Sequence, residues 1–134
     1  MTAESDRDVR YLSYLMPPVL WALTIFVGSS IPAMDFPDAD IFKVDKLIHL
    51  IIYLIFACLI YRALGMEGVP ALLGRHRLTV TFLIVAVYGA SDEFHQYFVP
   101  GRSMEFFDWV ADASGAIVWI LVVTVYKRFT ARRT

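Results

Sequence analysis

The sequence contains very little cysteine. Cys58 is the only one in 134 residues, which excludes a disulfide within the chain and a metal site made of cysteines. Charge is also scarce: charged residues make up 19% of the chain, against about 25% in ordinary soluble domains. Hydrophobic residues, in contrast, make up 58%. No internal repeat or low-complexity tract is present. The composition therefore indicates one small membrane domain covering residues 1–134.

Four apolar segments are each long enough to cross a bilayer, which takes about 20 mostly apolar residues. The sequence therefore predicts an all-α four-transmembrane-helix bundle. Pro17 and Pro18 are expected in the first turn of the first helix, where a missing backbone N–H costs nothing. Residues 1–10 then form a short charged tail, and Trp21 fits an aromatic belt at the membrane interface. The predicted helices cover residues 14–31, 47–64, 78–98 and 106–126.

Lysine and arginine lie mainly on one side of the predicted bundle. Basic residues gather in cytoplasmic loops, so this pattern predicts that both termini face the cytoplasm. Nine of the twelve lie in the two tails and the middle loop, namely Arg7, Arg10, Arg62, Arg75, Arg77, Lys127, Arg128, Arg132 and Arg133. The first and third loops hold the other three, Lys43, Lys46 and Arg102.

A polar stretch, residues 89–102, occupies the end of the third apolar segment. Polar side chains at membrane depth are costly and are usually functional. In the predicted topology, the start of the second helix, the end of the third and the start of the fourth share the extracytoplasmic end. Their polar residues should therefore converge on one site. Residues four apart share a helix face, and the pairs with this spacing are Asp45 and His49, Asp92 and Gln96, and Asp108 and Asp112.

Each of these groups also has a structural interpretation. Lys46 and Arg102 lie near helix ends, where basic side chains extend to lipid head groups or pair with neighbouring acids. His49 and His95 could simply bridge helices, as polar groups in membrane bundles commonly do. The small residues 113–116 are explained by close helix packing. A functional site is nevertheless favoured, because five acids and two histidines converge at one end.

Five motifs follow one another along the chain: Ser29-Ser30-Ile31-Pro32, Asp45-Lys46 with His49 and Tyr53, Asp92-Glu93-Phe94-His95-Gln96, Val99-Pro100-Gly101-Arg102, and Asp108 with Asp112 and Gly115. In order and spacing they resemble the VanZ-like family of small bacterial membrane proteins, over roughly residues 20–125. The family often carries asparagine at the position of Asp112, and an acid there makes the site more negative. The family's namesake is associated with resistance to the glycopeptide antibiotic teicoplanin. The resemblance implies a multi-pass protein of the bacterial cytoplasmic membrane with a role in the cell envelope.

The first functional hypothesis is an enzyme that acts on a lipid-linked or cell-wall precursor. His49 or His95 is then the general base, and Asp45 or Glu93 orients it. Lys46, Gln96 and Arg102 are the candidate ligand-binding residues, because cationic and amide groups hold phosphate or carboxylate. Carboxylate oxygens could instead hold a divalent metal, joined by histidine if the metal is zinc or manganese. The candidate metal ligands are Asp92, Glu93, Asp108 and Asp112.

The second hypothesis is a protein that binds or shields a ligand without catalysis, its polar end recognising a head group, a peptidoglycan stem or an antibiotic. A purely structural network that bridges the helices is a further alternative. Proton or ion translocation is disfavoured, because the cytoplasmic halves of the segments, such as 51–59 and 80–87, are almost wholly apolar. The expected partners are membrane lipids and a lipid-linked or cell-wall ligand, and no nucleic acid.

Overall fold

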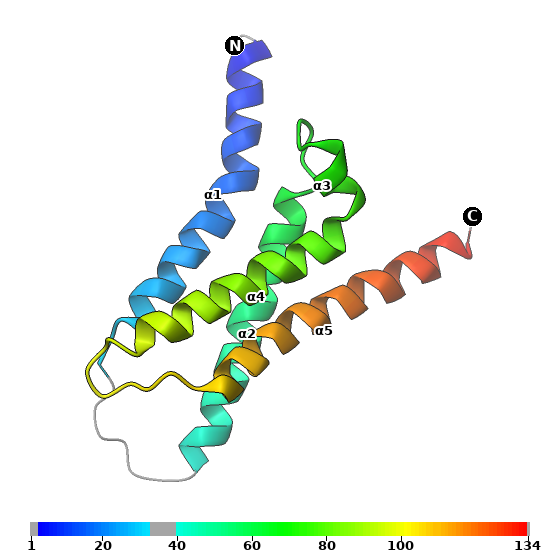
Figure 1. The fold of residues 1–134 in the computed structure, drawn as a ribbon. Helices are drawn as coiled ribbons and strands as arrows, with labels where there is room; N and C mark the ends of the chain where they lie inside the picture. The colour runs from blue at the N-terminus through cyan, green and yellow to red at the C-terminus, as the bar shows by residue number, and fades with distance from the viewer. Residues whose placement is uncertain (1–2, 33–39, 134) are drawn as a thin grey trace.

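The computed structural model describes residues 3–32 and 40–133. Every regular element in these two ranges is a helix, which confirms the all-α prediction (Figure 1). The short helix α3, between the second and third long helices, was not predicted. In chain order the elements are α1 (Ala3–Ser29), α2 (Asp40–Ala63), α3 (Ala71–Arg75), α4 (Arg77–Gln96) and α5 (Phe106–Ala131).

Within the described residues, three helices contain stretches long and apolar enough to cross a membrane: Asp8–Ser29, Val44–Ala63 and Phe106–Ala131. Helix α4 is a further long helix of 20 residues. Large apolar side chains point outward along all four, including those of Leu23, Ile51, Val87 and Leu121, whereas several charged side chains are buried. This distribution is typical of a protein whose surroundings are lipid.

Helix α1 begins earlier than the sequence predicted. Pro17 and Pro18 lie inside the helix, not in its first turn, and Ala3 to Arg10 are helical rather than a separate tail. Each proline removes one backbone donor, which bends a helix without having to end it. Figure 1 shows α1 changing direction part-way along its length. The additional turns are tied to the rest of the chain by an ion pair between Arg10 and Glu67, 3.3 Å apart.

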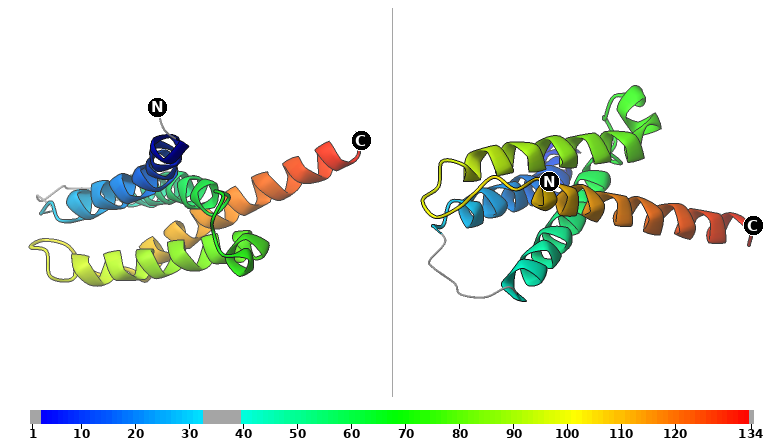
Figure 2. Two further views of the ribbon diagram at one scale, coloured as in Figure 1. Left: turned by 90° about the horizontal axis from the view of Figure 1, so that it is seen from above. Right: turned by 60° about the horizontal axis from the view of Figure 1, so that its bottom comes forward.

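Helix α2 is central and packs against α1, α4 and α5. It lies very close to α5 at Gly115, where an added Cβ would lie 2.5 Å from the carbonyl oxygen of Leu50 and 2.7 Å from the backbone nitrogen of Leu54. The predicted role of this small residue in close packing is therefore confirmed. The two views of Figure 2 show the C-terminal part of α5 extending away from the other helices. The buried core consists of Ile25, Tyr53, Phe56, Ala57, Val85 and Ala116.

Aromatic side chains tie the helices together through backbone carbonyls. The Trp21 indole donates to Ile52 O at 3.0 Å and joins α1 to α2. The Tyr88 hydroxyl donates to Ala22 O at 2.6 Å and joins α4 to α1. Such bonds stabilise contacts between helices in lipid, where no water competes for the donors.

The start of α2, the end of α4 and the start of α5 lie at one end of the molecule (Figure 1). The start of α1 and the end of α5 lie toward the opposite end, so the predicted convergence of three polar helix ends is present.

Candidate functional site

Lys46 joins the first turns of α2 to those of α5. Its ammonium contacts Asp108 and lies 2.8 Å from Glu105 Oε2 and 3.5 Å from Asp45 Oδ2. The hydrogen bond from Lys46 lowers the pKa of Glu105 below its usual value of 4.5. Pairing with acids, one of the structural interpretations of Lys46, is therefore what the structure shows.

A second polar cluster lies where α2, α4 and α5 meet. His49 Nδ1 donates to Asp112 Oδ1 at 2.9 Å, and Glu93 completes the cluster from α4. One potential ligand atom from each of the three lies within 4.8 Å of the others. Asp112 is fully buried and Glu93 is only 2% exposed. Within the described residues, Asp112 Oδ2 and Glu93 Oε1 have no hydrogen-bond partner.

A third set of polar contacts links α2 and α4 to the turn that follows α4. Asp92 Oδ2 accepts hydrogen bonds from the Tyr53 hydroxyl and from Gln96 Nε2, both at 3.3 Å. Arg102 Nε donates to Ile31 O at 3.0 Å, and Arg102 Nη1 lies 3.5 Å from Gln96 Oε1. Arg102 therefore holds the turn against the end of α1.

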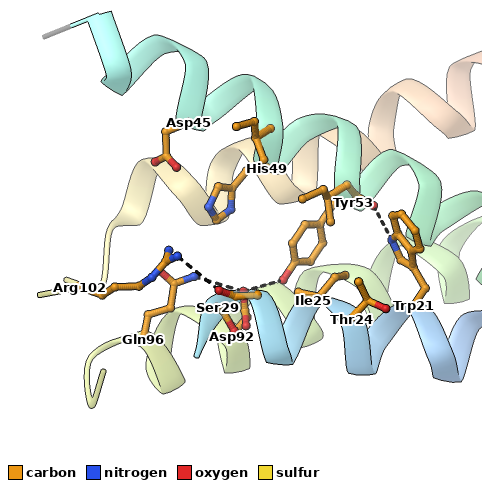
Figure 3. A pocket seen from close by; sticks show the side chains of 13 residues that line it. Trp21, Thr24, Ile25, Ser29, Asp45, His49, Tyr53, Asp92, Gln96 and Arg102 are labelled. Atoms are coloured by element: carbon orange, nitrogen blue, oxygen red, sulfur yellow. Dashed lines mark hydrogen bonds between the residues drawn. The ribbon is translucent and has the colours of Figure 1, made fainter. Parts of the chain in front are cut away.

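A pocket of about 330 Å³ lies between α1, α2 and α4. Figure 3 shows that its walls divide into two parts. One end is mostly apolar and is formed by Trp21, Thr24 and Ile25 from α1. The other end is polar, with Tyr53 between the two ends. The polar lining of that end consists of Ser29, Asp45, His49, Asp92, Gln96 and Arg102.

The family model VanZ/LLP1 matches residues 7–127. The chain belongs to the VanZ/LLP1 family. No curated protein and no solved structure matches it.

Most of the predicted site residues of this VanZ/LLP1 domain do come together. They do so in two neighbouring groups, which share His49. The pocket holds Asp45, Asp92, Gln96 and Arg102, and the contacts between α5 and its neighbours hold Lys46, Glu93, Asp108 and Asp112.

The predicted general base His95 lies apart from both groups. Its Nε2 is 2.9 Å from Ser30 Oγ, and its ring packs at a tilt against that of Phe26 with a centroid distance of 4.5 Å, so it faces α1. The reason is helical geometry: two residues after Glu93 is a rotation of about 200°, which places His95 on the opposite face of α4. The structure also differs from the expectation that Asp45 or Glu93 orients His49. The hydrogen-bond partner of His49 Nδ1 is Asp112.

The predicted set of metal ligands in the VanZ/LLP1 domain is likewise divided. Glu93 and Asp112 group with His49, and Asp108 groups with Asp45 and His49. Asp92 belongs to neither group and is bonded instead to Tyr53 and Gln96. Adjacent residues on a helix point about 100° apart, which separates Asp92 from Glu93.

Sequence reasoning missed the contribution of α1 to the site. Trp21, Ile25 and Gly28 line the pocket, although Trp21 was expected in an interfacial belt. A signal was present, because these three residues recur at the spacing of one helix face. It was not distinctive, since almost every residue around them is apolar as well.

Proposed function

We propose that this VanZ/LLP1 protein crosses the membrane four times, with both termini in the cytoplasm. The 20 residues of α4, at about 1.5 Å per residue, match a hydrocarbon thickness of about 30 Å. Its charged last turns are buried against α2 and α5, so lipid does not contact Asp92 or Glu93. The polar end would then face outward from the cytoplasm.

The topology can be tested with single cysteines placed in a Cys58→Ala background. We expect a cysteine at Ser103 to react in intact cells with a membrane-impermeant thiol reagent, and one at Gly68 to react only after lysis. Labelling at position 68 with protection at position 103 would reverse the proposed orientation.

Within this topology, we infer that the protein binds a lipid-linked molecule of the cell envelope by its head group. The observation that carries this inference is the pocket itself, which has an apolar end and a polar end. A volume of about 330 Å³ is in the range of small-molecule sites. It accommodates a head group and the first carbons of a chain, with the remainder of the chain in the bilayer.

The polar end offers groups suited to a phosphate-bearing head group. Arg102 has five N–H donors, and its backbone bonds leave part of this fork available. Guanidinium groups bind phosphate in a fixed planar geometry. If the ligand is a peptidoglycan precursor, its occupancy would change susceptibility to glycopeptide antibiotics, in keeping with the family resemblance.

The binding proposal can be tested with a long-chain prenyl phosphate and the matching uncharged prenol. Thr24 is an exposed pocket residue, so Thr24→Trp should fill the pocket without disturbing the core and abolish binding of both ligands. Arg102→Gln should weaken binding of the phosphate about tenfold and leave binding of the prenol unchanged. Arg75→Gln, in exposed α3, is the matched control. Equal effects of Arg102→Gln on both ligands would overturn the assignment of the head-group end.

A second candidate function is acid–base hydrolysis of the bound head group. The specific observation is the bond between His49 and Asp112, because a histidine oriented by a carboxylate is the arrangement of a general base. His49 also lines the pocket. Release of phosphate from a prenyl diphosphate by the parent, and not by His49→Gln, would favour this candidate over binding alone.

A further inference from the structure

Acidic groups outnumber basic ones at the polar end. Among the described residues, Lys46 forms ion pairs with these acids, whereas Arg102 bonds to backbone carbonyls and to the Gln96 amide oxygen. Lys46 is already held by acids on α2 and α5, and Arg102 is held by the end of α1. The surrounding acids are Asp45, Asp92, Glu93, Glu105, Asp108 and Asp112.

The excess of acidic groups includes the two most deeply buried carboxylates of the polar end. Glu93 and Asp112 are almost completely buried, and each has one carboxylate oxygen without a hydrogen-bond partner among the described residues. Asp112 Oδ2 lies toward α4, because a Cβ added at Gly89 would be 2.9 Å from it. Gly89 is one turn before Glu93 on the same helix face. Buried charge of one sign is costly unless a counter-charge or a metal satisfies it.

We propose that His49, Glu93 and Asp112 form a binding site for one divalent transition-metal ion. Their potential ligand atoms lie within 4.8 Å of one another. Ligands about 2.1 Å from an ion stand roughly 3–4 Å apart, so only a small closure is needed. One imidazole nitrogen with two carboxylates suits Zn²⁺ or Mn²⁺ better than the all-oxygen sites of Ca²⁺.

A second group of three possible ligands, Asp45, His49 and Asp108, is the weaker candidate. The ammonium of Lys46 contacts both of its carboxylates. A metal ion there would have to displace an existing cation, whereas Glu93 and Asp112 have no basic residue bound to them among the described residues apart from His49.

A metal ion at this site would take part in the proposed ligand binding, because His49 belongs both to the metal cluster and to the pocket. This role of the metal rests on the proposed function. Three protein ligands leave a coordination position for water or substrate. A phosphate held by Arg102 at the polar end could occupy that position, so the metal would offset the acidity of a pocket that binds an anion.

The test measures metal alone, without any lipid, so its outcome is independent of ligand binding. The full chain in mild detergent is stripped with a chelator and titrated with Mn²⁺, following the loss of the free-ion electron paramagnetic resonance signal, and Zn²⁺ is then added as a competitor. We expect one ion per chain. Glu93→Gln and Asp112→Asn should each weaken binding about 100-fold.

The matched control is Asp92→Asn, which removes a buried carboxylate next to Glu93 but outside the cluster. It should change affinity less than about threefold. Size-exclusion profiles and circular dichroism establish that each variant is folded. The proposal is overturned if the folded parent binds neither ion at millimolar concentration, or if Asp92→Asn weakens binding as much as Glu93→Gln.

Discussion

The two histidines at the polar end of this protein have different partners and face different helices. His49 donates to Asp112, a fully buried carboxylate, and lines the pocket. His95 contacts a hydroxyl and an aromatic ring on α1. The Ser30 hydroxyl donates to Phe26 O at 2.6 Å, so its hydrogen is directed at the backbone of α1 and not at His95.

The comparison teaches that proximity in the sequence does not make a site. The motif containing Asp92, Glu93 and His95 distributes its side chains around α4. Asp92 faces the pocket, Glu93 faces α5 and His95 faces α1. The structure therefore places Asp92, Glu93 and His95 in three different surroundings, and His95 joins α4 to α1.

The largest expected effect is the loss of protein stability when the bond between His49 and Asp112 is removed. Asp112→Ala leaves the buried His49 N–H without its acceptor and leaves a cavity in place of the carboxylate, and the two effects together cost about 2–5 kcal/mol. The measurement is the free energy of unfolding in mixed detergent micelles. Asp112→Asn keeps an acceptor for His49 and should recover part of the loss. Equal stability of Asp112→Ala and the parent would contradict the assignment of this pair.

The second largest expected effect is the loss of stability when the close packing of α5 against α2 is disturbed. Gly115→Ala forces a methyl group against the backbone of α2, which side-chain motion cannot relieve, and overpacking of this kind costs about 1–3 kcal/mol.

The matched control for this substitution is Gly28→Ala on the α1 side, where an added Cβ meets nothing within 4 Å. Alanine is the better helix former by about 1 kcal/mol, so this variant should equal or exceed the parent in stability. The packing account is contradicted if the two substitutions have the same effect.

A smaller effect is expected from breaking the His95 contact. His95→Ala and Ser30→Ala should each cost about 1 kcal/mol, as single hydrogen bonds between helices do. The double variant should lose less than the sum of the two single losses, because both substitutions remove the same bond, and His95→Ala additionally removes the ring contact with Phe26. Fully additive losses in this double-mutant cycle would contradict a stabilising bond between His95 and Ser30.

The smallest effect concerns Glu105, which is 39% exposed. Because its pKa is lower in the folded protein, its ion pair with Lys46 stabilises the fold above pH 4.5 and loses that effect as the pH falls below this value. Solvent screening keeps the contribution to about 0.2–1 kcal/mol. The difference in unfolding free energy between the parent and Glu105→Gln should therefore shrink with acidification. A difference that grows at low pH would contradict the sign of the shift.

The sequence predicted where the polar residues meet but not how they are divided. Convergence followed from connectivity, because antiparallel neighbouring helices bring the start of α2, the end of α4 and the start of α5 to one end. The rotation of α4 did not follow, since its polar residues occur on several faces and any of them could have faced inward. The wall formed by α1 was missed because lipid-facing and pocket-facing residues are both apolar. The start of α1 was wrong because a double proline bends this helix instead of beginning it.

The central claim is that the ligand binds in the pocket lined by His49 and does not contact His95. The most direct measurement compares the affinity of a long-chain prenyl phosphate for the parent, His49→Gln and His95→Gln in lipid nanodiscs. We predict a loss on the order of tenfold for His49→Gln and a change within about twofold for His95→Gln. A loss for His95→Gln equal to or greater than that for His49→Gln would contradict the account.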